Sequence, residues 1–176
     1  MSSLPDSLLN MFIDRPAIPE NVTVIGIISD THGLLRPEAL TPFIGAERIV
    51  HAGDIGSPNV LEKLESIAPV VAVRGNNDKA PWAESLPETL LFEVRGHTIH
   101  VLHDVAQIDL SPKAAGVDVV ISGHSHKPEI DDREGVLFIN PGSAGPRRFR
   151  LPIAVAKLYV ADDSVRAEII ELKLPG

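Results

Sequence analysis

Side chains that can bind metal ions follow five apolar segments of the chain, at the points where those segments end. The five clusters are, in chain order, SDTHG with Asp30 and His32, HAGDI with His51 and Asp54, GNND with Asn76, Asn77 and Asp78, HD with His103, and GHSH with His124 and His126. Imidazole together with carboxylate and amide oxygen suits Mn, Fe, Zn, Ni or Co, whereas Ca²⁺ prefers cages of oxygen alone. The residue types therefore indicate a transition-metal site.

The number of donors exceeds what one ordinary metal ion needs. Seven such residues together are already too many for one ordinary site. A carboxylate can bridge two ions, and Asp54 is the candidate for that role. Two ions about 3.5–4 Å apart can clamp both the attacking and the leaving oxygen of an in-line displacement at phosphorus. Each cluster alone is also typical of a polar turn, but five in succession favour a binuclear site.

Short apolar segments along the chain have the length of β-strands, and most of them precede these clusters. They are Val22–Ile28 and the shorter runs 48–50, 70–73, 117–121 and 136–139. Helical patterns separate the first of them: residues 36–44, and a segment with Ser57 as N-cap and Pro58 at the first helical position. Alternating strands and helices predict a parallel sheet whose strands share one carboxyl edge, where sites form.

The second half of the chain has a more antiparallel pattern. Residues 89–94 and 98–102 flank the turn RGH, and residues 153–160 and 165–172 flank ADDS, as in β-hairpins. We therefore expect an α/β fold in which two mixed sheets pack face to face with helices outside. Several prolines and no periodic pattern in residues 1–20 predict an N-terminal extension, followed by a single domain over residues 21–176.

Composition and charge exclude several classes of protein. The chain has 176 residues, 44% of them hydrophobic, which is ample for a packed core. Its formal net charge of −8 argues against long nucleic acid as a partner, because Lys and Arg drive that binding. It has no cysteine, no signal-peptide pattern and no run near the roughly 20 apolar residues that cross a bilayer. We expect a cytoplasmic protein that does not contact membranes.

The ordered motifs resemble the calcineurin-like metallophosphoesterase superfamily, and within it the small capless prokaryotic phosphodiesterases. The resemblance is carried by SDTHG, HAGDI, VRGNND, GHSHKP and NPGS, over residues 24–145. It implies a four-layer α/β/β/α sandwich of two mixed β-sheets flanked by helices. It also implies two divalent metal ions and a metal-bound hydroxide that attacks phosphorus. Mn²⁺ is the expected metal, with Ni, Zn, Fe and Co as alternatives.

The resemblance further implies a role for each candidate residue. Asp30, His32 and His126 would hold the first ion. Asn76, His103 and His124 would hold the second, with Asp54 between the two. His51 would orient a ligand from behind, as hydrogen-bonding partners of metal ligands commonly do.

Two positions depart from the family pattern. Asn77 stands where much of the superfamily has a histidine and many small members have a cysteine. Its amide can donate a hydrogen bond to a phosphate oxygen, but it cannot release a proton to a leaving group near pH 7. We therefore expect good leaving groups to be hydrolysed much faster than poor ones. Asp104 replaces the usual glycine after the histidine ligand, and it either perturbs the second metal or faces solvent.

The sequence predicts a metal-dependent phosphodiesterase that acts on small diesters, and the analogy allows a homodimer. Two alternatives stay open: a phosphomonoesterase of the same fold, and a non-catalytic interaction scaffold like a retromer subunit. Several other polar residues are interpreted as structural, namely His97, His100, Asp78 and Arg74. The basic segment RRFR at 147–150 is either a solvated loop or an attractor of phosphorylated substrate.

Overall fold

The first of two β-sheets contains the first and the last strands of the described residues. The computed structural model describes residues 17–176, so the predicted extension over residues 1–20 lies mostly outside the described residues. The strands are β1 (Val22–Ile28), β2 (Arg48–His51), β3 (Val70–Ala72), β9 (Ala154–Ala161) and β10 (Val165–Glu171), in the order β10-β9-β1-β2-β3. β1, β2 and β3 are parallel to one another, and β9 is antiparallel to both of its neighbours, β1 and β10.

The second sheet is built from the middle of the chain. Its strands are β4 (Thr89–Val94), β5 (His97–Leu102), β6 (Val119–Ile121), β7 (Glu129–Arg133) and β8 (Val136–Asn140), in the order β4-β5-β6-β8-β7. β5, β6 and β8 are parallel, and the two edge strands are antiparallel. Both predicted hairpins are confirmed. β7 was not predicted, because its sequence EIDDR is acidic and lacks an apolar alternation; charged residues suit its place at the edge of the sheet.

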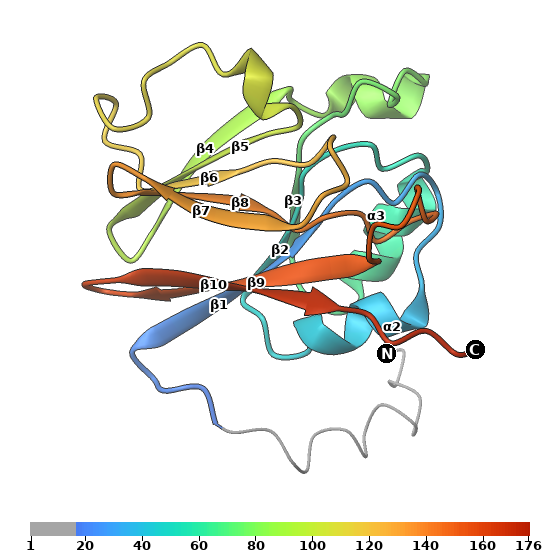
Figure 1. Cartoon of the computed structure of the whole chain (residues 1–176), viewed down its shortest axis with the longest axis horizontal. Coiled ribbons are helices and arrows are strands. Elements are labelled where there is room, and N and C mark those ends of the chain that lie inside the picture. The colour runs from blue at the N-terminus through green and yellow to red at the C-terminus, as the bar shows by residue number, and fades with distance from the viewer. Residues whose placement is uncertain (1–16) are drawn as a thin grey trace.

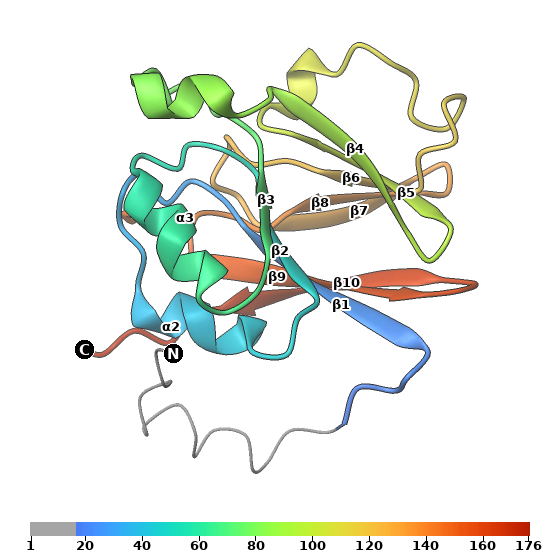
Figure 2. The same ribbon diagram turned by 180° about the vertical axis from the view of Figure 1, so that it is seen from behind.

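Helices cover the outer face of the first sheet (Figures 1 and 2). They are α2 (Pro37–Leu40), which continues into the 3₁₀ turn η2 (Thr41–Phe43), and α3 (Pro58–Glu65). The predicted cap of α3 is confirmed: the Ser57 Oγ accepts the Asn59 N–H over 3.3 Å, and Pro58 occupies the first turn. None of the described helices is long and apolar enough to cross a membrane.

The outer face of the second sheet has a thinner cover. The segment from 103 to 118 crosses it, with a 3₁₀ turn, η4 (Val105–Gln107), as its helical element (Figure 1, yellow). Another 3₁₀ turn, η3 (Pro81–Ser85), precedes β4. The predicted sandwich of two mixed sheets is confirmed, while its two helical layers are unequal.

The sandwich is held together by two large apolar clusters on opposite faces of the first sheet. Between the sheets, Ile25 and Ile27 of β1 pack with Val101 of β5 and Ile121 of β6. On the outer face, residues of α2, η2 and α3 pack against the sheet, with Phe43 fully buried. A side chain at Gly26 would collide with the Phe43 ring, so this glycine allows the helical layer to lie close to β1.

Candidate metal centre

The carboxyl ends of strands from both sheets meet at one edge of the sandwich. The register of the parallel strands sets Ile28 beside His51, and His51 beside Ala72. The loops that follow β1 and β2 are joined by a backbone hydrogen bond, because the Asp30 N–H donates to the Gly53 carbonyl over 3.0 Å. The loops after β5 and β6 reach the same edge from the second sheet. All five predicted clusters therefore meet in one place.

An unusual backbone conformation is concentrated in these loops. Among the described residues, eight other than glycine have a positive φ angle. Five of the eight are candidate ligands: Asp30 (55°), His32 (47°), Asp54 (52°), His124 (69°) and His126 (60°). Such residues are uncommon, and they persist where the surrounding structure holds them, most often at functional sites. Here they turn the chain directly after each strand, so that closely spaced donors face a common centre.

Two glycines let the loops approach one another. A Cβ at Gly75 would collide with the backbone nitrogen and carboxylate of Asp54, and one at Gly123 would collide with Ser29 Oγ and approach Asp30. Backbone and buried atoms occupy both spaces, so neither loop can give way cheaply. The glycines of VRGNND and GHSH are therefore required for the donors to come together.

The first group of donors, here called the closed half, consists of Asp30, His32 and His126. Asp30 Oδ1 lies 3.2 Å from His126 Nε2 and 3.9 Å from His32 Nε2, and the two Nε2 atoms are 3.4 Å apart. Despite this closeness, Asp30 Oδ1 is buried and makes no well-aligned hydrogen bond to any residue of 17–176. Its other oxygen accepts from Ser29 Oγ over 2.6 Å and from the His124 N–H over 3.0 Å.

Protonation in the closed half follows from burial and neighbouring charge. Burial raises the pKa of Asp30, but contact with His126 and the hydrogen bond from Ser29 outweigh burial and hold that pKa below its ordinary value. Burial lowers the pKa of His32, with Asp54 and Asp30 opposing it and Arg148 acting in the same direction. The carboxylate is therefore ionised and the His32 ring neutral at pH 7, which is the state that binds a cation.

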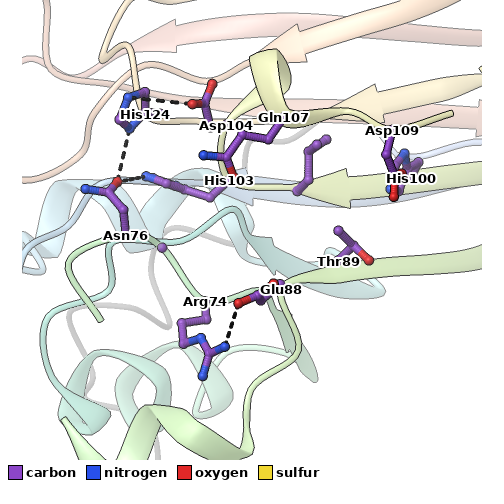
Figure 3. Close-up of a pocket in the computed structure, with 12 residues that line it drawn as sticks. Arg74, Asn76, Glu88, Thr89, His100, His103, Asp104, Gln107, Asp109 and His124 are labelled. Carbon is purple, nitrogen blue, oxygen red and sulfur yellow. Dashed lines mark hydrogen bonds and ion pairs between the residues drawn. The ribbon is translucent and has the colours of Figure 1, made fainter. Parts of the chain in front are cut away.

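The second group, here called the open half, consists of Asn76, His103 and His124 (Figure 3). The His103 Nδ1–H donates to the Ala52 carbonyl over 2.7 Å, which leaves Nε2 as the free nitrogen of the neutral ring. Nε2 faces Asn76 Oδ1 at 3.0 Å, and His124 Nδ1 lies 3.1 Å from the same oxygen. Burial lowers the pKa of His103, but contacts with Asp54 and Ala52 raise it overall, so these acceptors attract positive charge to the ring.

Asp54 lies between the two halves. Its Oδ2 is 3.8 Å from His32 Nε2 and 3.4 Å from His103 Nε2. Burial raises the pKa of Asp54, but contact with the His103 ring and hydrogen bonds from both the backbone and the side chain of Asn77 hold it far below its ordinary value. Asp30 also approaches both halves, because its carboxylate lies with His32 and His126 on one side and with Asp54 and His103 on the other.

The donor set fits metal ions. Two groups of side chains bring their carboxylate oxygens and ring nitrogens together: Asp30 with His32 and His126, and Asp30 with Asp54 and His103. In each group the ligand atoms lie within 4.8 Å of one another. Such atoms repel one another unless a cation lies between them. Carboxylate, imidazole and amide oxygen are ligands typical of Mn, Fe, Co, Ni and Zn.

A family model for the calcineurin-like phosphoesterase superfamily domain matches residues 24–163. The chain belongs to this superfamily. A probable metallophosphoesterase of Methanothermobacter thermautotrophicus is 38% identical over 164 residues, which cover 86% of this chain and 94% of that protein. A phosphodiesterase of Methanocaldococcus jannaschii is 31% identical over 136 residues, 67% of this chain and 82% of that protein. The structure of vacuolar protein sorting 29 from Cryptosporidium parvum has the same fold, with a TM-score of 0.74 at 20% identity over 88% of this chain and 93% of that one.

His51 lies beneath the candidate metal centre and not in it. It is fully buried; its Nδ1 accepts the Gly53 N–H over 3.2 Å, and its Nε2 lies 2.9 Å from Thr31 Oγ1. The Thr31 hydroxyl donates in turn to the Ile55 carbonyl over 2.9 Å. Burial lowers the pKa of His51 to about 4, so the ring is neutral. His51 therefore fixes the segment between Asp30 and His32 and has no free nitrogen for substrate.

Asn77 is turned toward Asp54. Its side-chain N–H donates to Asp54 Oδ2 over 2.7 Å, and its backbone N–H donates to Oδ1 over 2.9 Å. The sequence had suggested a donor to phosphate; the structure gives one of the two amide hydrogens to the carboxylate between the halves. An amide carries a second hydrogen, which can still meet a substrate oxygen.

The two neighbouring carboxylates have different roles. Asp78 is buried and accepts backbone N–H groups from Ile55, Gly56 and Gly75 at 2.9–3.1 Å, so it holds the turn together, as expected. Asp104 caps η4 by accepting the Ala106 N–H over 3.0 Å. Its other oxygen lies 3.9 Å from His124 Nε2, which places negative charge beside the open half.

A cleft of about 370 Å³ adjoins the open half (Figure 3). Asn76, His103 and His124 form one end. The rest is formed by residues of β4 and β5, of the segment after β5 and of the loop between β3 and β4. His100, interpreted from sequence as structural, lines this cleft. Sequence analysis missed it because its position depends on how the segment 103–118 crosses the sheet. It also missed Ser29 and Thr31, although their position inside the motif SDTHG, beside Asp30 and His32, could have pointed to them.

Proposed function

We propose that this protein is a phosphodiesterase that uses two divalent metal ions, with Mn²⁺ as the physiological metal. The observation that carries the proposal is the convergence of seven donors into two groups with Asp54 between them. Asp30, His32 and His126 would hold one ion, and Asn76, His103 and His124 the other. This donor set offsets only half of the charge of two divalent cations, so the loaded site attracts an anion such as a phosphoester.

The chemistry supplied by such ions is Lewis-acid stabilisation of the phosphoryl oxygens and a lowered pKa of water. The residues of the chain keep the donors of this site in one protonation state and one orientation. Asp54 stays ionised over the physiological pH range, because contact with His103 and the hydrogen bonds from Asn77 lower its pKa. The hydrogen bond from His103 to Ala52 holds the ring with Nε2 toward the site.

A diester is favoured over a monoester by two observations. The open half continues into a cleft that has room for a second ester arm. The residue next to the ligand Asn76 is an amide that cannot protonate a leaving group. The relative from Methanocaldococcus jannaschii, 31% identical, bears the name phosphodiesterase, which supports the same choice.

Hydrolysis of bis-p-nitrophenyl phosphate and p-nitrophenyl phosphate by chelator-stripped protein tests the proposal. Mn²⁺, Ni²⁺, Zn²⁺ and Mg²⁺ are added back singly, with Asp54→Ala as the inactive control. We expect Mn²⁺ to restore diester hydrolysis in the wild type and not in the variant. Faster hydrolysis of the monoester would indicate a phosphomonoesterase instead. Folded protein that hydrolyses neither compound with any metal would favour a scaffold, a role consistent with the fold shared with vacuolar protein sorting 29.

A further inference from the structure

The cleft beside the open half contains a buried polar group that the metal centre does not use. His100 of β5 is only 3% exposed and lines the cleft. Its Nδ1 atom is buried and has no hydrogen-bond partner in the described part of the chain. Burial lowers the pKa of His100, with Asp109 opposing this effect, so the ring is neutral and offers one N–H and one lone pair. A buried polar atom without a partner is rare and calls for a ligand or an ordered water.

The charged groups of the cleft are mostly acidic. Glu88, Asp104 and Asp109 line it together with a single cation, Arg74. The Arg74 guanidinium donates to Glu88 over 2.8 Å, so its charge is already matched. Asp104 and Asp109 therefore leave the cleft with an excess of negative charge (Figure 3). Thr89 and Gln107 add neutral hydrogen-bonding groups.

The position of the cleft determines what it can receive. It begins at three residues of the open half, so a phosphoester bound there would extend one of its substituents into the cleft. Its volume of about 370 Å³ is within the range of pockets that hold small organic ligands. A surplus of carboxylate acceptors suits hydroxyl and amino hydrogens, whereas a second anionic group would meet repulsion.

We propose that this cleft is the subsite for the second ester arm of the substrate, and that it selects an uncharged, hydroxyl- or amino-bearing arm of nucleoside or sugar type over an arm with a further phosphate. His100 contributes a neutral hydrogen-bonding group at the side of the cleft. Asp104 and Asp109 contribute the charge that rejects anionic arms. The inference rests on the proposed diesterase activity and adds to it a class of substrate.

Three diesters with the same leaving group, p-nitrophenolate, test this subsite in the Mn²⁺-loaded enzyme. They are methyl p-nitrophenyl phosphate, thymidine 5′-(p-nitrophenyl phosphate), and the same thymidine compound with a 3′-phosphate. We expect kcat/KM for the thymidine diester to exceed both others by about tenfold, a factor that corresponds to about 1.4 kcal/mol. In His100→Ala the advantage of thymidine over methyl should shrink several-fold, mainly through KM.

A charge-matched pair of variants separates the effect of the charge in the cleft from the effect of the overall charge of the protein. Asp109→Asn removes an exposed carboxylate of the cleft. Asp163→Asn removes an exposed carboxylate from the β9–β10 turn, outside the cleft. We expect the penalty for the 3′-phosphate to fall at least threefold in Asp109→Asn and to persist in Asp163→Asn. Equal penalties in the two variants, or a wild type that hydrolyses all three diesters equally well, would overturn the subsite while leaving the diesterase intact. If the enzyme hydrolyses none of them, the proposed function fails and the subsite with it.

Discussion

The two halves of the candidate metal centre use similar donors in different surroundings. In the closed half, Asp30 is fully buried and His126 is 3% exposed. In the open half, the side chain of His124 is 46% exposed and Asn76 is exposed, while His103 is buried beneath them. The charges nearby also differ: the cation Arg148 acts on His32, whereas the anion Asp104 lies 3.9 Å from His124.

We expect this difference to separate holding a metal ion from using it. A buried site with several mutual contacts loses its ion slowly, because the ligands cannot turn away without leaving polar groups unpaired. A site with exposed ligands exchanges its ion more readily and is accessible to a substrate. We therefore expect two phases of Mn²⁺ binding, a tight one from the closed half and a weaker one from the open half.

The largest effect is expected when the closed half loses a ligand. His126→Ala removes a buried imidazole 3.2 Å from Asp30 Oδ1. We expect kcat/KM for bis-p-nitrophenyl phosphate to fall by more than about 100-fold, since even the partners of metal ligands are worth about 10- to 100-fold. Isothermal titration with Mn²⁺ should lose its tight phase.

His97→Ala is the matched control for this change. His97 is a partly buried histidine outside the centre, with Nε2 3.0 Å from the Ala161 carbonyl. It should keep both binding phases. A His126→Ala protein that also kept both phases would show that the closed half does not hold the tight ion.

The second effect concerns His51, which supports the loop of the closed half, and it depends on pH. The folded protein holds the pKa of His51 at about 4, and the unfolded chain has the ordinary value of 6.5. Below pH 6.5 the unfolded state therefore binds a proton that the folded state refuses, so stability falls as pH drops from 6.5 to 4. The loss is about 3 kcal/mol over the whole window.

Urea unfolding of metal-free protein at pH 7 and pH 5 measures this effect. His51→Gln keeps a polar side chain but cannot titrate, so its stability should change less between the two pH values than that of the wild type. Asp30 and Asp54 titrate below their ordinary value of 3.8 and lie outside the window. Equal pH dependence in the wild type and the variant would mean that His51 is not the group responsible.

The sequence predicted the parts of this centre that depend on local order. Asp30, Asp54 and Asn76 each follow a short apolar strand, and parallel strands bring such ends to one edge whatever the details of packing. The cap at Ser57 and both hairpins were predictable for the same reason, because turn and cap residues act over a few positions. These features predicted the fold, and they proposed seven donors that the structure brings to one edge of the sandwich.

The remaining features depend on contacts between distant segments. In an extended segment His124 and His126, two positions apart, would point to the same side. Their left-handed backbone, held in place by Gly123 against Ser29 and Asp30, lets the two rings serve different halves. The orientation of Asn77 depends on Asp54, which comes from another strand. Sequence spacing contains none of these three-dimensional constraints.

A smaller effect is expected when the open half loses a ligand. His124→Ala removes an exposed imidazole 3.1 Å from Asn76 Oδ1. We expect about a tenfold loss of kcat/KM at low Mn²⁺, because Asn76, His103 and Asp54 remain. Raising the Mn²⁺ concentration should restore most of it, which distinguishes weaker binding from lost chemistry. A deficit that Mn²⁺ cannot reduce would contradict the division into closed and open halves.

The smallest effect is expected at Asn77, the residue that connects the halves through Asp54. Asn77→Ala removes the 2.7 Å hydrogen bond to Asp54 Oδ2, which is worth about 1 kcal/mol and lowers kcat/KM by about fivefold. Because an amide cannot release a proton, this loss should be the same for aryl and alkyl diesters. The wild type itself should strongly favour aryl diesters, since no acid at this position assists the leaving group.

A series of diesters with leaving groups of graded pKa measures both expectations at once. The slope of log kcat/KM against leaving-group pKa should be steep in the wild type and unchanged in Asn77→Ala. Asn77→His restores a titratable N–H at the same position and should make the slope shallower. A flat slope in the wild type would mean that a group other than Asn77 protonates the leaving group.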